Sequence, residues 1–345
     1  MSGAGIRVNF EKWEGLGNDF ILLEHNVRYP VTPEIAQTLC DRRRGIGGDG
    51  VLVVECDRHA PPTPRPSLLP PPTGLRHSHP PFVLGAIRPR MTVFNADGSR
   101  PEMCGNGIRC VAAYLVLHGL ASAPRPTAAP PGAWVPIGKP RSRPSTTAFP
   151  AARTTTAPTS MSADSNPQGV ELVVSTDAGE RHCVIARKSD ADFDVNVEMG
   201  SAHFENDLLI SSGGWDHRFM VVDVGNPHAV TFDDYNQAEI DRVAPVISAA
   251  RAGGLNVEFA RIVATSPPHI DVTVWERGVG RTLACGTGAC AVVAAACHTR
   301  RSSFGTSTRV TLPGGELEIT VPAPGSPIQM RGPARRVFSG EFALT

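Results

Sequence analysis

The sequence predicts an α+β protein made of two similar halves, each with one buried helix surrounded by strands. Residues 106–117 and 287–298 are alanine-rich and apolar on nearly every face, and a helix that is apolar all round lies inside a core. A Cys-Gly-[Asn/Thr]-Gly motif begins just before each of these helices, at Cys104 and at Cys285. This repeat predicts two matching domains that face each other.

Short runs of β-branched, aliphatic and aromatic residues predict the strands around these helices. The runs cover residues 20–23, 51–54, 91–94, 171–174, 219–222, 270–275 and 316–321. Apolar residues at helical spacing predict one further, amphipathic helix over residues 34–43.

Two proline-rich segments interrupt this pattern. Residues 57–90 and 121–169 hold 20 of the 32 prolines and show neither helical nor strand periodicity. Such segments cannot bury enough apolar surface to offset the entropy lost on ordering. We therefore interpret them as insertions without chemistry, which leaves an N-terminal domain over residues 5–120 and a C-terminal domain over residues 170–328.

The composition excludes several classes of protein. Lys and Arg together number 33, as do Asp and Glu, so no net charge favours nucleic acid or an anionic membrane as a partner. The sequence shows no signal peptide and no apolar run long enough to span a bilayer, which predicts a cytoplasmic protein. None of the eight cysteines forms a Cys-x-x-Cys pair, so we expect free thiols and no metal site.

The repeated motif places the same chemistry at the start of both buried helices. The first amides of a helix have no partners within the helix, so they can bind an anion such as a substrate carboxylate. The positive end of a helix also stabilises a thiolate, which predicts a cysteine pKa below the usual value of about 8.5. Cys104 and Cys285 are therefore candidate acid–base groups, each beside a carboxylate site.

Two such cysteines on opposite faces of one carbon can invert a stereocentre. One thiolate removes the proton, the other thiol supplies a proton to the opposite face, and the helix ends stabilise the carbanion through its carboxylate. Racemases that use pyridoxal phosphate need a lysine, but Lys12, Lys139 and Lys188 have no convincing pocket context. The sequence thus predicts an amino-acid racemase or epimerase that uses no cofactor.

Eight stretches in the right order carry a family resemblance. They are Gly-Leu-Gly-Asn-Asp-Phe (15–20), Gly-Ile-Gly-Gly-Asp-Gly (45–50), Phe-Asn-Ala-Asp-Gly-Ser (94–99), Glu-Met-Cys-Gly-Asn-Gly (102–107), Gly-Asn-Pro-His (225–228), Asn-Val-Glu-Phe (256–259), Trp-Glu-Arg-Gly (275–278) and Ala-Cys-Gly-Thr-Gly-Ala (284–289). Over nearly all of the chain outside the insertions, the sequence resembles the diaminopimelate epimerase family.

The resemblance implies two similar domains, each a central buried helix wrapped by a curved mixed sheet, with the active site in the cleft between them. The C-terminal strand over residues 329–345 would join the first domain. The implied enzyme converts LL- to meso-diaminopimelate in the biosynthesis of lysine and peptidoglycan precursor. It would be a homodimer and would need neither metal nor pyridoxal phosphate.

The resemblance also implies residue roles. Cys104 would accept the proton in the LL-to-meso direction and Cys285 would donate one. The implied substrate-binding residues are Asn18, Asn95, Asn226, Asn256, Glu276, Arg277 and the backbone of Gly105, Asn106, Gly286 and Thr287. Arg277 would grip the distal carboxylate with both branches of its guanidinium, while His228 and Glu276 would adjust the thiol pKa values. Gly50 stands where the family often has glutamine, so a side-chain contact would be missing there.

Two other functions fit parts of the pattern. A related two-cysteine racemase could act on another amino acid, such as histidine or proline, although the asparagines and Glu276-Arg277 favour a substrate with a distal polar end. A non-catalytic protein could use the two helix ends only to bind an anion. The glycines of residues 45–50 have the wrong spacing for a dinucleotide-binding loop.

Overall fold

A computed structural model describes residues 6–56, 89–120, 169–212 and 214–344, which belong to one compact unit. The two proline-rich segments lie outside the described residues, apart from residues 89, 90 and 169. Within the described ranges, no helix has both the length and the apolar character needed to cross a membrane.

Among its described residues, the first half of the chain forms seven strands and two helices. They are β1 (Ile6–Gly15), β2 (Asn18–Glu24), α1 (Pro33–Cys40), β3 (Gly50–Glu55), β4 (Arg90–Asn95), α2 (Gly105–Leu117), β5 (Val170–Thr176), β6 (Gly179–Arg187) and β7 (Asp192–Glu198).

The second half contains the remaining strands and two more helices. They are β8 (His203–Phe204), β9 (Leu208–Ser212), β10 (Trp215–Asp223), β11 (Pro227–Thr231), α3 (Gln237–Ser248), β12 (Asn256–Thr265), β13 (Pro268–Glu276), β14 (Gly280–Arg281), α4 (Gly286–His298), β15 (Thr308–Leu312), β16 (Gly315–Thr320) and β17 (Gln329–Leu344).

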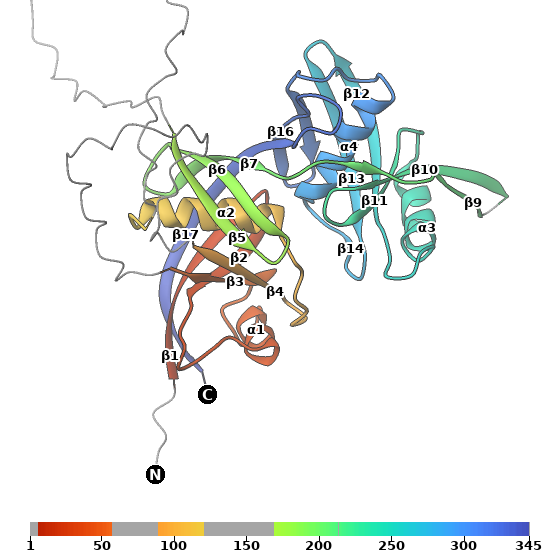
Figure 1. Cartoon of the computed structure of the whole chain (residues 1–345). Coiled ribbons are helices and arrows are strands. Elements are labelled where there is room, and N and C mark those ends of the chain that lie inside the picture. Colours follow the sequence, from red (N-terminus) through yellow and green to blue (C-terminus); the bar gives the residue numbers. More distant parts are fainter. Residues whose placement is uncertain (1–5, 57–88, 121–168, 213, 345) are drawn as a thin grey trace, which may run out of the picture. The chain divides into compact units, whose positions relative to one another are not determined.

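The strands around α2 close into a ring. Each strand from β1 to β7 pairs with the next, and β17 pairs with both β7 and β1. The β2–β3 and β4–β5 pairs are parallel and the others are antiparallel. All of these strands contact α2, which runs between them (Figure 1). The predicted curved mixed sheet around a central helix is confirmed here.

The second central helix, α4, lies against β10, β11, β12 and β16. Here too the sheet is mixed, because β11 runs parallel to β12 and β13 parallel to β15, while the other pairs are antiparallel. Twelve of the thirteen residues of α4 are buried, which agrees with its apolar sequence on all faces.

Strand β17 belongs to the surroundings of both central helices. Its first residues pair with β16 on one side and β7 on the other, and its later residues pair with β1. The C-terminal strand thus pairs with strands of the first half of the chain. Strands β5 to β7 also complete the ring around α2, so the predicted boundary at residue 170 does not coincide with the strand pairing.

The seven predicted strands are present, and α2 and α4 match their predicted ranges within one residue. Helix α1 ends at Cys40, earlier than predicted, because Asp41 turns the chain and its carboxylate accepts the amides of Arg43 and Arg44. The prediction missed α3, although Asn236 and Glu239 form a capping box at its start. Pro245 inside that helix reads as a helix breaker in the sequence.

An ion-pair network holds the turn between β1 and β2 against the loop that precedes β3. The buried ammonium of Lys12 lies 2.7 Å from the Asp19 carboxylate. Nη2 of Arg42 bridges Asp19 and Asp49 at 2.6 and 2.7 Å. Burial alone would raise the pKa of Asp19, but hydrogen bonds from Arg42 and Lys12 outweigh it and bring the pKa to about 2. Asp19 is therefore ionised at neutral pH and neutralises Lys12.

Replacing Asp19 by Asn should destabilise the protein, because Lys12 stays buried without its counter-charge. Such a loss costs about 3–5 kcal/mol, and we expect about 3 kcal/mol in urea unfolding at pH 7, since 23% of the Asp19 side chain is exposed. The folded pKa of about 2 lies below the unfolded value near 3.9. The difference in the free energy of unfolding between the wild type and Asp19→Asn should thus be fully present above about pH 4 and vanish as the pH falls towards 2.

Asp190→Asn is the control, because it removes a carboxylate that pairs with Arg187 at the exposed surface. It should leave the free energy of unfolding unchanged. An Asp19→Asn protein as stable as this control at pH 7 contradicts the role given to the network.

Candidate active site

Each central helix begins at a cysteine with the same local geometry. Cys104 is the N-cap of α2 with φ −134° and ψ 117°, and Cys285 is the N-cap of α4 with φ −124° and ψ 110°. Each Sγ accepts a hydrogen bond of 3.4 Å from an amide three residues later, in Gly107 or Gly288. The repeated motif thus places both thiols at the positive end of a buried helix.

The two helix starts meet directly. A methyl group added to Gly105 would lie 3.3 Å from Cα of Gly286, and one added to Gly286 would lie 3.4 Å from Cα of Gly105. The Asn106 side chain also donates a hydrogen bond of 3.2 Å to the carbonyl of Ala284. Only glycine allows backbones to approach so closely, so the first amides of both helices converge on one place.

Asparagine side chains gather beside the start of α2. Nδ2 of Asn106 donates to Oδ1 of Asn18 at 2.8 Å, and Nδ2 of Asn18 faces Oδ2 of Asp49 at 3.3 Å. Asn95 is exposed at the end of β4, where it pairs in register with Gly50 and donates to Ser99 Oγ. The structure therefore joins Asn18 to Asn106 and leaves the Asn95 side chain at the neighbouring strand end.

A side chain has no room at Gly50. A methyl group there would lie 2.7 Å from the carbonyl oxygen of Phe94, closer than a β carbon comes to a neighbour without a backbone shift. The pairing of β3 with β4 therefore leaves no space for a glutamine side chain at this position.

The second half places its site residues on three neighbouring strands. His228 on β11 pairs in register with Asn256 on β12. Nε2 of His228 bonds to Oδ1 of Asn226 at 3.0 Å, and Oδ1 of Asn256 accepts the backbone amide of Arg277 at 3.1 Å. Strand pairing thus brings together asparagines that are far apart in the sequence.

Glu258 is a buried residue of this group that the sequence analysis did not select. Its Oε1 lies 2.7 Å from Nδ1 of His228, both side chains are fully buried, and its Oε2 has no hydrogen-bond partner among the described residues. A methyl group on Gly288 would lie 2.5 Å from this carboxylate, which therefore packs against the first turn of α4. The sequence feature that could have identified Glu258 is a single carboxylate among the apolar residues of the buried part of β12.

Ligand atoms of His228, Glu258 and Cys285 all lie within 4.8 Å of one another, a spacing that could hold a metal ion. The imidazole and the carboxylate already contact each other at 2.7 Å, however, so one proton lies between Nδ1 and Oε1 whichever group carries it. The arrangement equally suits proton exchange with the Cys285 thiol.

Both thiol pKa values lie above the ordinary value, which corrects the prediction that the helix ends lower them. Burial raises the pKa of Cys285 strongly, the carboxylates of Glu276 and Glu258 raise it further, and the amide of Gly288 opposes them only in part. Burial also raises the pKa of Cys104, against the opposing effect of the Gly107 amide. The helix amides act as predicted, but the loss of water outweighs them.

Glu276 links the two thiols electrostatically. Its charge raises the pKa of both Cys104 and Cys285. Burial in turn raises the pKa of Glu276, and the neighbouring Thr282 side chain opposes this rise in part. Glu258 adds its charge to that of Glu276 beside Cys285.

Arg277, like Asn95, is exposed. Its Nη1 donates to the carbonyl of Gly253 at 2.9 Å. The residue lines a cavity of about 880 Å³ together with Trp275 and the end of α3. Its backbone is tied to Asn256, while its side chain bonds outside the asparagine group.

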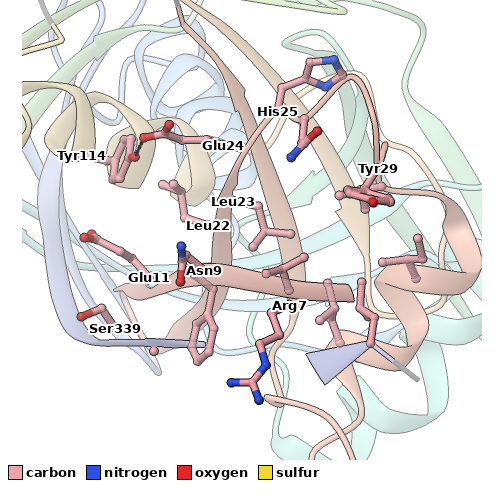
Figure 2. A pocket seen from close by; sticks show the side chains of 18 of the residues that line it. Arg7, Asn9, Glu11, Leu22, Leu23, Glu24, His25, Tyr29, Tyr114 and Ser339 are labelled. Atoms are coloured by element: carbon pink, nitrogen blue, oxygen red, sulfur yellow. Dashed lines mark hydrogen bonds between the residues drawn. The ribbon is translucent and has the colours of Figure 1, made fainter. Parts of the chain in front are cut away.

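A separate cavity of about 660 Å³ lies where β1, β2 and α1 meet the end of β17 (Figure 2). It is lined by residues such as Arg7, Glu11, Tyr29 and Tyr114. None of the predicted site residues is among the described residues that line it. This cavity is therefore separate from the residues predicted to form the site.

The sequence matches the family model of diaminopimelate epimerase over residues 10–132 and 220–337, more than half of the chain. The chain belongs to the diaminopimelate epimerase family. The diaminopimelate epimerase of Acaryochloris marina is 33% identical over 343 residues, covering 98% of this chain and 99% of that protein. That of Leptospira biflexa is 32% identical and covers 98% and 100%. Membership confirms the predicted family and the predicted class of enzyme, an isomerase.

Solved structures with low sequence identity share the fold. A hydroxyproline epimerase from Agrobacterium vitis has a TM-score of 0.59 at 13% identity, covering 98% of this chain and 93% of that one. A phenazine biosynthesis protein from Bacillus anthracis has a TM-score of 0.58 at 12% identity, covering 98% and 99%. These likenesses confirm the fold class predicted for this family member.

The pKa directions make a testable statement about thiol reactivity, because only the thiolate reacts with iodoacetamide. We expect the labelling rates of Cys104 and Cys285 to have pH midpoints above the value of about 8.5 for a free thiol. Glu276→Gln should lower both midpoints, because it removes a nearby negative charge. Peptide mapping after labelling over a pH series measures each thiol, and a midpoint below that of a free thiol for either one contradicts this reasoning.

Proposed function

We propose that the protein interconverts LL- and meso-diaminopimelate by a two-base mechanism without cofactor or metal. The observation that supports it best is the direct meeting of two cysteine-capped helix starts at Gly105 and Gly286 in a member of this family. Two thiols at converging anion sites suit the inversion of a carbon that bears a carboxylate.

In this proposal the substrate carboxylate binds the first amides of α2 and α4, donated by residues 105–106 and 286–287. The thiolate of Cys104 removes the α-proton of the LL isomer, and the Cys285 thiol protonates the opposite face. The carbanion between these steps is stabilised by the amides that hold its carboxylate. No net oxidation occurs, and one proton leaves the substrate while another enters it.

The remaining site residues recognise the polar groups of the substrate. We propose that Asn18, Asn95, Asn226 and Asn256 bind its ammonium and carboxylate groups, and that Arg277 binds the distal carboxylate. The last role requires the guanidinium to exchange its bond with Gly253 for the substrate. His228 and Glu276 adjust the pKa of the thiols.

We also propose that the enzyme acts in the cytoplasm as a homodimer, in the formation of lysine and of peptidoglycan precursor. Light scattering on the purified chain distinguishes a dimer from a monomer. Incubation with LL-diaminopimelate in deuterium oxide tests the activity itself, since an epimerase labels the α-carbon and yields the meso isomer, whereas a protein that only binds anions does neither.

Single Cys104→Ala and Cys285→Ala variants should each lose epimerisation by about 10²–10⁴-fold or more, because one base cannot serve both faces. Proton NMR of the substrate measures the rate. Cys110→Ala is the matched control, since this buried cysteine lies on α2 but does not cap it. It should stay within a few-fold of the wild type, and a Cys110→Ala protein as inactive as Cys104→Ala yet folded contradicts the assignment.

Prolonged dialysis against a chelator, without added pyridoxal phosphate, should leave the rate unchanged. The proposed proton transfers need only the two thiols and the helix amides. Elemental analysis before and after dialysis accompanies the assay. A loss of activity that returns on adding a metal ion rules out the metal-free mechanism and would assign a catalytic role to the ligand set of His228, Glu258 and Cys285.

A further inference from the structure

A buried arginine lies directly behind the start of α2. The side chain of Arg109 is fully buried. Its Nε donates to the carbonyl of Pro333 at 3.0 Å, its Nη1 to the carbonyl of Gly105 at 3.2 Å, and its Nη2 to Oδ1 of Asn106 at 2.9 Å. No carboxylate of the described residues forms an ion pair with it. A buried charge is costly unless it is paired, so this position needs an explanation beyond packing.

The surrounding strands leave a place for the guanidinium. A methyl group on Gly15, at the end of β1, would lie 3.2 Å from its Nη2. One on Gly332, in β17, would lie 3.4 Å from its Nε, although it would clash first with Leu317. The guanidinium therefore lies against the backbone of two strands that enclose α2.

Arg109 determines the orientation of the Asn106 amide. A guanidinium can only donate hydrogen bonds, so the amide must turn its oxygen towards it. The NH₂ group of Asn106 then points the other way and donates to Oδ1 of Asn18 at 2.8 Å and to the carbonyl of Ala284 at 3.2 Å. Both amide hydrogens of Asn106 are thereby used, one on each half of the site.

The orientation of the Asn106 amide in turn fixes that of the Asn18 amide. Because its Oδ1 accepts from Asn106, its own NH₂ group faces Oδ2 of Asp49 at 3.3 Å. Asp49 is held by Arg42, and its carboxylate accepts only. The chain of bonds from Arg109 through Asn106 and Asn18 to Asp49 therefore has a single direction, set by a donor-only group at one end and an acceptor-only group at the other.

We propose that Arg109 is a positioning residue for the epimerase reaction, which orients Asn18 for the substrate through the side chain of Asn106. This inference rests on the proposed function. Arg109 touches neither thiol in this arrangement and acts through Asn106. Its positive charge behind the start of α2 also favours the thiolate of Cys104.

The decisive variant is Asn106→Asp. It keeps an oxygen for Arg109, and even pairs the buried charge, so the fold should remain intact. It removes both N–H donors, so Asn18 and Ala284 lose their partner. A misplacement of about 1 Å can lower a rate by about 10²-fold, and we expect kcat/KM for epimerisation to fall by about that factor. Asn196→Asp is the matched control, because this partly buried asparagine of β7 bonds only to Gln329 and should keep full activity.

A double-mutant cycle separates positioning from a general structural effect. If Asn106 acts through Asn18, then Asn106→Asp in an Asn18→Ala background should lower kcat/KM by only about twofold more. Arg109→Met should lower kcat/KM in the wild-type background and add little to the loss in the Asn18→Ala background. Arg109→Lys should be as impaired as Arg109→Met, because one ammonium cannot bond to Pro333 and Asn106 together. Circular dichroism and thermal unfolding confirm that the variants fold.

The outcomes distinguish a failure of the proposed function from a failure of the role inferred for Arg109. A wild type that neither labels nor inverts LL-diaminopimelate contradicts the proposed function and this inference with it. An active wild type with a fully active Asn106→Asp variant overturns only the inference. Additive losses in the double-mutant cycle also overturn it, since they show that Arg109 and Asn106 do not act through Asn18.

Discussion

The backbones of Gly105 and Gly286 lie in close contact, and the proposed mechanism depends on this contact. It brings two helix N-termini together, each equivalent to roughly half a positive charge. The guanidinium of Arg109 adds a full positive charge behind one of them. Three positive groups facing one small space repel one another unless an anion lies between them. The carboxylates of Glu258 and Glu276 meet part of this need, and a substrate carboxylate would meet the rest.

The same contact explains why the surrounding strands are so constrained. The first residues of β17 lie between β7 and β16, and Met330 of this strand would lie 3.0 Å from a methyl group on Gly286. A shift of β17 would therefore move both helix starts together. The carbonyl of Pro333 on the same strand accepts a hydrogen bond from Arg109. The closing strand of the ring thus holds the helix contact and the buried cation in one place.

Local patterns in the sequence predicted the parts of the fold that local physics decides. The apolar segments became α2 and α4, and the repeated motif placed both cysteines as N-caps, because helix formation and capping depend on neighbouring residues. Arg109 was detectable as the one charged residue in an otherwise apolar helix. What it bonds to was not, since Pro333 is more than two hundred positions away.

Long-range pairing and burial explain what the sequence could not reveal. The domain boundary predicted near residue 170 does not match the strand pairing. The residues of β5 to β7 contain no local pattern that shows which strands they pair with, although they close the ring around α2. Glu258 was passed over because its contact with His228 arises from the parallel pairing of β11 and β12. The sequence predicted a lowered pKa for Cys285, whereas the structure raises it. A motif reveals the helix amides that lower a thiol pKa, but it does not reveal the burial that raises it. The predicted substrate-binding roles stay predictions, including that of Arg277, whose side chain bonds to Gly253.

The charges around the two cysteines are unequal, and the inequality has a direction. Glu276 opposes the thiolate at both cysteines, but Arg109 favours it at Cys104, whereas Glu258 adds to the opposition at Cys285. These two unequal charges favour a shared proton on Cys285. In the proposed mechanism this is the starting arrangement for the LL-to-meso direction, with Cys104 as the base and Cys285 as the acid. A turnover in that mechanism moves the proton to Cys104, against this preference. The proton must then return to the side of Cys285, where the buried pair of His228 and Glu258 lies.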